Sequence, residues 1–187
     1  MVTAMRQLVG RPSEREHASY YTRYISLVPE DDIMSVLEAQ TQDLGSSLGT
    51  VPPGREGYSY APGKWSIREV VGHIADTERL LGYRAFCISR GEQAPLPGFD
   101  ENAYVARSTY AQRSLSDLIE EFSLVRRANL LVFEGLELAG WEQVGTANGN
   151  PVSVRAVAFV MAGHVRYHTN ILRERYDVSS ISCARRS

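Results

Sequence analysis

The sequence predicts an all-α protein: a four-helix bundle with a long crossover connection between its second and third helices and an N-terminal arm. Four segments repeat hydrophobic residues at spacings of three and four, the period of one helix face. Most prolines and glycines fall between these segments, and strand signals are weak throughout. A chain of 187 residues suits one domain. We expect residues 1–29 to form the arm, 30–176 the bundle and 177–187 a disordered tail.

The first two helices have recognisable beginnings. Asp31 precedes the first as a possible N-cap. The apolar positions of that helix are Ile33, Leu37, Leu44 and Leu48, with Gln40 interrupting them at the centre. The second begins at a capping box, in which the side chains of Ser66 and Glu69 can each bind the other's backbone N–H. It should end near residue 90, where Gly91 supplies a C-terminal stop.

The connection between the second and third helices spans residues 91–113, which is long for a hairpin. It could cross the length of the bundle, with a short helix at residues 101–106, and so permit parallel second and third helices. The third helix should begin near Ser114 and the fourth near Ser153, after a turn at residues 148–151. Their repeating positions are Leu115, Leu118, Phe122, Val125, Asn129, Val132 and Leu136, and then Val154, Val157, Met161, His164, His168 and Ile171.

Composition excludes several classes of partner. The formal net charge is −2, and the 20 basic and 22 acidic residues are interspersed, so no basic stripe predicts nucleic-acid binding. No window approaches the roughly 20 apolar residues of a membrane span, and the N-terminus lacks a signal-peptide pattern, so no membrane partner is expected. Cys87 and Cys183 are too few for a disulfide framework, which fits a cytoplasmic location. Neither a phosphate-binding loop nor a nucleophile elbow is present.

His164 and His168 lie on the apolar face of the fourth helix, roughly 6 Å apart along its axis. His73 flanks the apolar face of the second helix. Three imidazole nitrogens of this set could hold one divalent ion and leave positions open for water or substrate. The alternative is that His164 and His168 are hydrogen-bonded core histidines and that His73 is unrelated.

Polar residues also interrupt the other three helices at mid-height, namely Gln40, Thr77 and Asn129. This coincidence predicts a polar cavity inside the bundle, where such folds commonly build metal and cofactor sites. Asp76 and Glu78 follow His73 and could orient a ligand or move a proton, although carboxylates are common on helix surfaces.

Two further residues are expected to lie away from the site. His17 stands in the charged stretch SEREH and should be at the surface. Tyr167 is one step of about 100° from His168, which turns it off the histidine face.

Three stretches, over roughly residues 20–176, carry a family resemblance: YAPGKWSIREVVGHIADTERL, PLPGFDENAYVARSTYAQRSLSDLIEEF and TANGNPVSVRAVAFVMAGHVRYHTNILRERY. In this order they resemble the DinB-like superfamily of small metalloenzymes. The resemblance implies a four-helix bundle, usually a homodimer, with a long connection between its second and third helices. It also implies a divalent metal, zinc or nickel foremost and manganese or iron as alternatives, held by His73, His164 and His168.

The fourth-helix motif departs from the pattern of many relatives. Where they read GHELHH this chain reads GHVRYH, so Val165 and Tyr167 replace a glutamate and a histidine. The expected ligand positions remain. The H-E-x-x-H pattern, whose glutamate is the general base of zinc proteases, is lost, and peptidase activity is disfavoured.

Three functions remain open at this point. The first is an S-transferase in which the metal activates a low-molecular-weight thiol toward a small electrophilic substrate, with Gln40, Asn129 or Asp76 positioning the two. The second is a metal-dependent hydrolase with Asp76 or Glu78 as the base. The third is a non-catalytic, stress-associated, metal-binding dimeric bundle.

Overall fold

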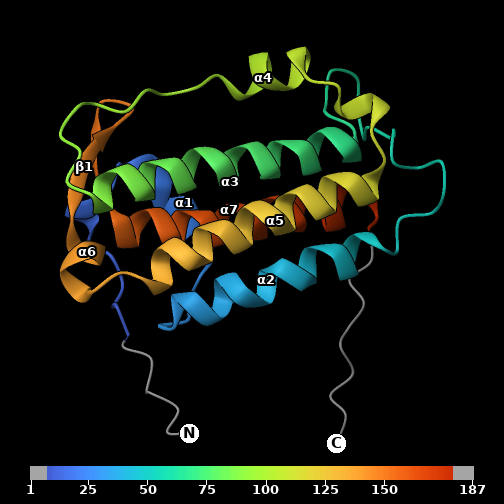
Figure 1. Ribbon diagram of the computed structural model, residues 1–187. Helices are drawn as coiled ribbons and strands as arrows, with labels where there is room; N and C mark the ends of the chain where they lie inside the picture. The colour runs from blue at the N-terminus through green and yellow to red at the C-terminus, as the bar shows by residue number, and fades with distance from the viewer. Residues whose placement is uncertain (1–7, 179–187) are drawn as a thin grey trace, which may run out of the picture.

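A computed structural model describes residues 8–178 of the chain (Figure 1). Four long helices form the bundle: α2 (Ile33–Leu48), α3 (Ile67–Ser89), α5 (Leu115–Glu134) and α7 (Val154–Tyr176). Helix α3 contacts α5 and α7, and α2 contacts the same two helices, so the four close into a ring. The predicted all-α four-helix bundle is therefore confirmed.

The connection between α3 and α5 does cross the bundle. Figure 1 shows it leaving the end of α3, running back over that helix through α4 (Glu101–Arg107) and delivering the chain to the far end, where α5 begins. Helices α3 and α5 consequently run in the same direction, and α2 and α7 run in the opposite one. The short helix expected at residues 101–106 is present and is one residue longer.

The shorter elements are the 3₁₀ turns η1 (Glu14–Glu16), η2 (Ser19–Tyr21) and η3 (Tyr110–Gln112), the helices α1 (Thr22–Ile25) and α6 (Leu138–Glu142), and the strands β1 (Val144–Ala147) and β2 (Asn150–Ser153). The two strands form an antiparallel hairpin that the sequence predicted only as a turn. Asn148 and Gly149 make the turn with φ of 50° and 73°, which a two-residue hairpin requires. Four-residue strands containing a glycine and a proline carry too weak a pattern to be recognised.

The helix caps explain where two of the long helices begin. Ser66 Oγ accepts a hydrogen bond from the Glu69 backbone N–H at 3.4 Å, while Glu69 accepts one from the Ser66 backbone N–H at 2.7 Å. This confirms the predicted capping box. At α2 the cap is Asp32 rather than Asp31, since Asp32 accepts from the Ser35 backbone N–H at 3.1 Å.

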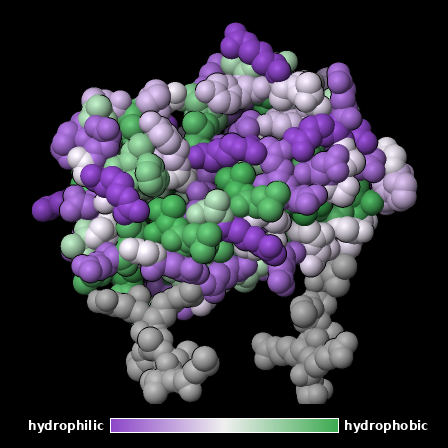
Figure 2. Space-filling model, viewed as in Figure 1, coloured by the Kyte–Doolittle hydropathy of each residue, from purple (hydrophilic) through white to green (hydrophobic). Residues whose placement is uncertain are grey.

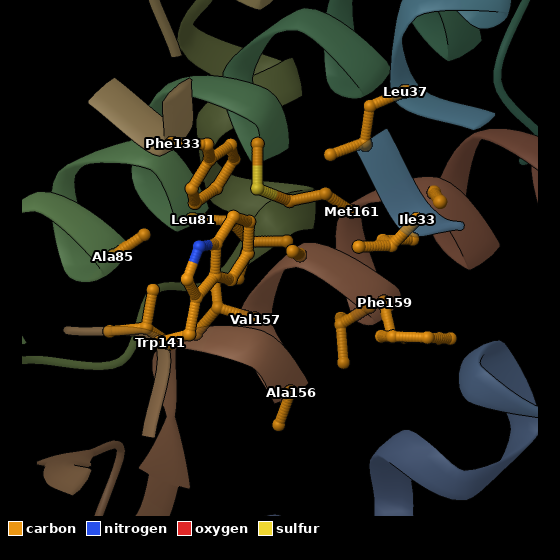
Figure 3. Close-up of a cluster of buried hydrophobic side chains, with 14 of the residues drawn as sticks. Ile33, Leu37, Leu81, Ala85, Phe133, Trp141, Ala156, Val157, Phe159 and Met161 are labelled. Carbon is orange, nitrogen blue, oxygen red and sulfur yellow. The ribbon is translucent and has the colours of Figure 1, made fainter. Parts of the chain in front are cut away.

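The buried hydrophobic residues form two clusters inside the bundle. Figure 3 shows part of one cluster, where the stacked rings of Phe133 and Trp141, with centroids 5.0 Å apart, meet Leu81 and Met161. The buried face of α5 differs from the predicted one, because its members are Leu118, Phe122, Arg126, Leu130 and Phe133. A fully buried arginine, Arg126, thus replaces the expected Val125 at the centre of the bundle.

The N-terminal arm packs on α7. A Cβ atom at Gly163 would lie 2.0 Å from the Tyr24 carbonyl oxygen, so only glycine lets α1 approach α7 this closely. Glu16 also binds Arg155 of α7 at 2.6 Å. Burial raises the pKa of Glu16, but hydrogen bonds from Arg155, Ser13 and Ser153 outweigh it and lower the pKa to about 2.

One expectation about the arm is wrong. His17 is 8% exposed rather than at the surface, because the chain folds back onto the hairpin and α7 there. The expected tail lies outside the described residues from position 179 onward, and so do the first seven residues of the arm.

The outer surface is mixed. In the view of Figure 2, hydrophobic residues gather in separate groups between charged ones, and Leu124 and Leu131 of α5 are 59% and 71% exposed. Within residues 8–178, every helix is too short or too polar to cross a membrane.

Candidate metal centre

Three histidines from two helices meet inside the bundle. His73 of α3 and His164 and His168 of α7 each offer a ring nitrogen, and the three nitrogens lie within 4.8 Å of one another. Nε2 of His73 is 3.0 Å from Nε2 of His164. The side chains are buried, with 6%, 5% and 8% of their surface exposed. The structure thus brings together the three residues that the sequence proposed as ligands.

Burial makes these histidines neutral near pH 7. It lowers the pKa of His73 to about 4 and that of His168 to about 3, where the neighbouring His73 and Arg23 add to the effect. It also lowers the pKa of His164 well below its usual range. A neutral imidazole keeps one nitrogen lone pair, which is the form that binds a metal ion.

A glycine precedes His73 and another precedes His164, and at each glycine another part of the chain lies too close to the helix backbone for a side chain to fit. At Gly72, before His73, a Cβ would lie 2.4 Å from the Tyr110 ring. At Gly163, before His164, it would collide with the Tyr24 backbone. The connection after α4 and the arm therefore press against the helix backbones beside the histidines and hold the two helices in place. The repeated Gly-His pair is a local signal that the sequence contains.

Aromatic rings surround the triad. The Trp65 ring packs against His73 at 4.8 Å between centroids, and Tyr24 packs edge-on against His164 at 5.4 Å. Tyr167 packs edge-on against His168 at 5.2 Å and lines the adjacent cavity, so the expectation that it turns away from the site is wrong. A step of 100° moves the Cα off the histidine face, but the long tyrosine side chain reaches back over it toward the arm.

The triad opens into a cavity of about 580 Å³. Its walls are largely aromatic, with contributions from Tyr20, Tyr24, Tyr60, Trp65, Tyr167 and Tyr176. Thr77, one turn after His73, also lines it, and its Oγ1 has no hydrogen-bond partner within residues 8–178. Three converging neutral imidazoles beside an unpaired hydroxyl, with open space in front, fit a divalent cation that keeps free coordination positions.

The other polar residues singled out on the helix faces do not line this cavity. Glu78 instead receives two hydrogen bonds from the Arg126 guanidinium, both at 2.8 Å. Asn129 Nδ2 donates to Glu78 Oε1 at 2.8 Å, and Arg126 Nη1 donates to Gln40 Oε1 at 3.0 Å. Gln40 Nε2 in turn donates to the Ala162 carbonyl at 2.9 Å. Four helices are thereby joined by one closed cluster, which we call the Arg126 network.

The Arg126 network corrects the predicted polar cavity. Of the polar residues that the sequence singled out on the helix faces, Thr77 and the three histidines line the cavity. Gln40, Glu78 and Asn129 instead bind one another and Arg126, a residue that the sequence pattern did not single out. Arg126 lies four residues after Phe122, so the three-four spacing allowed it on the buried face as readily as Val125. An arginine at a position with the spacing of the buried face was the signal from which a buried charge could have been predicted.

Asp76 lies on another side of α3, outside the cavity wall. Burial raises its pKa, against the lowering effects of a hydrogen bond with Tyr110 and the charge of Arg79. Its Oδ1 is 3.7 Å from Arg79 Nη1. Asp76 therefore makes no contact with the cavity that would support its proposed role in proton transfer or substrate positioning.

The chain is similar to known proteins in sequence and in fold. A family model described as the DinB superfamily matches residues 19–172. YfiT from Bacillus subtilis, described as a probable metal-dependent hydrolase with an unusual four-helix bundle topology, superposes with a TM-score of 0.69 at 16% identity, covering 90% of this chain and 94% of that one. No curated protein matches the chain.

A second solved structure shares the fold. It is a mycothiol-dependent maleylpyruvate isomerase, with a TM-score of 0.64 at 16% identity. The match covers 84% of this chain but only 63% of the isomerase, so the isomerase has a substantial part without a counterpart here. At these identities both structures establish the fold alone.

Proposed function

Because the chain belongs to the DinB superfamily, we propose that it is a divalent-metal-dependent enzyme that transfers a low-molecular-weight thiol to a small electrophilic substrate. The proposal draws on the buried histidine triad and on the thiol dependence described for the isomerase of similar fold. His73, His164 and His168 would hold the ion. Zinc or nickel is the first choice to test, because both bind imidazole nitrogen well.

The observation that carries the proposal is that, among the described residues, aromatic rings pack on the triad and no carboxylate joins its cluster of possible ligand atoms. Glu101 is the only acidic residue among the described residues that line the cavity, and the groups packed on the histidines are aromatic rings. A metal-bound water has a pKa of about 7 and is still partly protonated at neutral pH, so hydrolysis gains from a base that takes its proton. A bound divalent ion would lower the pKa of a coordinating thiol, which then needs no separate carboxylate to become the nucleophile.

The residues that line the cavity would orient the two substrates and limit their contact with water. The neutral histidines lie at one end of the site, and the tyrosine walls would limit the access of water to the reacting groups. A cavity of about 580 Å³ falls in the range that holds small-molecule ligands. It is large enough for a thiol and a second small substrate to meet.

A hydrolase is the second candidate, and two observations favour it. YfiT, of similar fold, is described as a probable metal-dependent hydrolase. Glu101 does line the cavity, and it could act as a base if substrate lay between it and the triad. In that case turnover would require the metal and Glu101 but no added thiol.

Metal binding is the first thing to measure. We expect protein purified without chelators to contain close to one equivalent of a divalent metal. Added zinc or nickel should raise the stability of chelator-treated protein, by about 2.7 kcal/mol at a free concentration 100 times the Kd. His168→Ala should lose both effects, while His17→Ala, which alters a buried histidine outside the cavity wall, should keep them.

Activity then separates the candidates. The assay pairs cysteine, glutathione or N-acetylcysteine with the electrophilic reporter monochlorobimane, beside a screen of esters, amides and lactones without thiol. Metal-dependent conjugation that His168→Ala abolishes supports the transferase. Thiol-independent turnover of an ester or lactone that Glu101→Gln abolishes would replace it with the hydrolase, and no metal binding at all would exclude both.

A further inference from the structure

Arg84 is a buried cation that neither the triad nor the Arg126 network uses. It lies on α3, is 4% exposed and lines the same cavity as the histidines. It follows His73 by eleven residues, which returns the helix to within about 20° of the same face after about 16 Å of rise. The cavity therefore has the triad toward one end and a guanidinium toward the other.

The guanidinium of Arg84 is held by neutral groups alone. Its Nη1 donates to the Tyr21 hydroxyl at 3.3 Å, and its Nη2 donates to the Pro97 carbonyl at 2.6 Å. No carboxylate within residues 8–178 forms an ion pair with it. Arg126, equally deep in the same bundle, has both Glu78 oxygens as partners. A buried charge without a counter-charge is costly, and such a charge normally has an anionic partner.

The charged side chains that line the cavity are mostly cationic, like Arg84 itself. Among the described residues, Arg23, Lys64 and Arg84 line it, and Glu101 is the one carboxylate that does. Arg23 lies over the Tyr20 and Tyr24 rings, 3.9 Å and 4.8 Å from their centroids, so its charge stays at the cavity wall. The excess of cationic side chains in the lining attracts anions before any metal is added.

We propose that Arg84 binds a carboxylate of the substrate, so that the cavity takes an elongated organic acid whose carboxylate pairs with Arg84 while its reactive end faces the triad. The planar guanidinium suits a carboxylate because it offers two parallel N–H donors. The Tyr21 and Pro97 contacts hold it in position before the ligand arrives. The orientation of the ligand rests on the proposed function, whereas the anion site itself does not.

Phenyl-substituted acids of graded chain length test the site, since their rings suit the aromatic walls. The probes are 3-phenylpropionate, 5-phenylvalerate and 6-phenylhexanoate, each with its neutral amide, titrated calorimetrically into chelator-treated protein and into zinc-loaded protein. At the preferred length, we expect the acid to bind the chelator-treated protein about tenfold or more tightly than its amide, as charge-assisted hydrogen bonds imply.

Variants assign that preference to Arg84. Arg84→Gln keeps a donor for the Pro97 carbonyl, removes the charge and should bring the acid-to-amide affinity ratio to about one. Arg90→Gln removes the same charge from the exposed end of α3, outside the cavity wall, and should leave the ratio unchanged. Arg84→Lys, the second variant if the glutamine variant does not fold, should keep part of the preference.

The outcomes separate this inference from the proposed function. An acid preference that depends on Arg84 in metal-free protein upholds the anion site even if no metal or thiol activity is found. An acid-to-amide ratio near one in the unaltered protein overturns it, whatever the variants do. A preference that survives in folded Arg84→Gln, or that Arg90→Gln removes equally, also overturns it.

Discussion

The Arg126 network and the histidine triad are two polar clusters buried in one bundle, and they differ in how far they satisfy themselves. Glu78 and Arg126 meet through two 2.8 Å hydrogen bonds, and Gln40 and Asn129 take up further donors and acceptors. In the triad, the one hydrogen bond among the described residues joins two histidines, and the nearby Thr77 hydroxyl has none. A closed cluster is typical of structure, and an open one beside a cavity is typical of a ligand site.

The two clusters are also connected. Gln40 belongs to the network and donates to the carbonyl of Ala162, two residues before His164. The closed cluster thus ties α2 to the segment of α7 that carries the ligands. The Arg126 network thereby helps to fix the position of the histidines, as the supporting residues of a binding site commonly do.

Breaking the network should have the largest effect. Arg126→Met leaves Glu78 buried without its cation and should lower the free energy of unfolding by about 3–5 kcal/mol. Urea denaturation of metal-free protein measures it. Arg127→Met, at the exposed neighbouring position, should change stability by about 0.5 kcal/mol or less.

The matching change in the triad sharpens the contrast. His168→Leu removes a buried ring that has no hydrogen bond to another of the described residues, and stability should stay within about 1 kcal/mol. A loss as large as that of Arg126→Met would show that the triad is a structural cluster like the network.

Acid should destabilise the metal-free protein through the triad. The folded pKa values of His73 and His168, about 4 and about 3, lie below the unfolded value of 6.5, so the unfolded chain takes up protons first as pH falls. Their stabilising contribution is full above pH 6.5 and declines below it, by about 3 kcal/mol for the two at pH 5.5. His164 shifts in the same direction.

Urea unfolding at pH 7.5, 6.5 and 5.5 measures this loss. Glu16, with a pKa lowered to about 2, contributes only to a separate loss below pH 4.5. In the double variant His73→Leu with His168→Leu the decline between pH 6.5 and 5.5 should be much smaller. An unchanged decline would assign it to other groups.

A change smaller than that of Arg126→Met is expected at the contact between the arm and the triad. Gly163→Ala places a Cβ against the Tyr24 carbonyl, so α1 must move away from α7, at a cost of about 1–3 kcal/mol. Hydrogen exchange of residues 22–28 should rise. Gly135→Ala is the control, because a Cβ there meets its nearest atoms at 3.6 Å and φ is −81°. Unchanged exchange in Gly163→Ala would mean that glycine is not required for the approach.

Sequence periodicity predicted the bundle because each long helix buries one continuous face. It also predicted the capping box at Ser66 and the shared face of His164 and His168, since each depends on spacing within one segment, while the grouping of His73 with that pair came from the comparison of several helices and from the family resemblance. The hairpin was missed because its strands are four residues long. Asp32 replaced Asp31 as a cap because neighbouring aspartates are indistinguishable without the backbone path.

What the sequence determined by itself, then, is the helices, their apolar faces and the position of His73, His164 and His168 on those faces. Only the tertiary structure decided which polar residues share a partner. Glu78, Gln40 and Asn129 joined Arg126 rather than the cavity, and Arg84 was left there without a counter-charge. The reason is physical: periodicity records which face of one helix is buried, whereas the pairing of buried charges depends on the rotation and height of helices that are far apart in the chain.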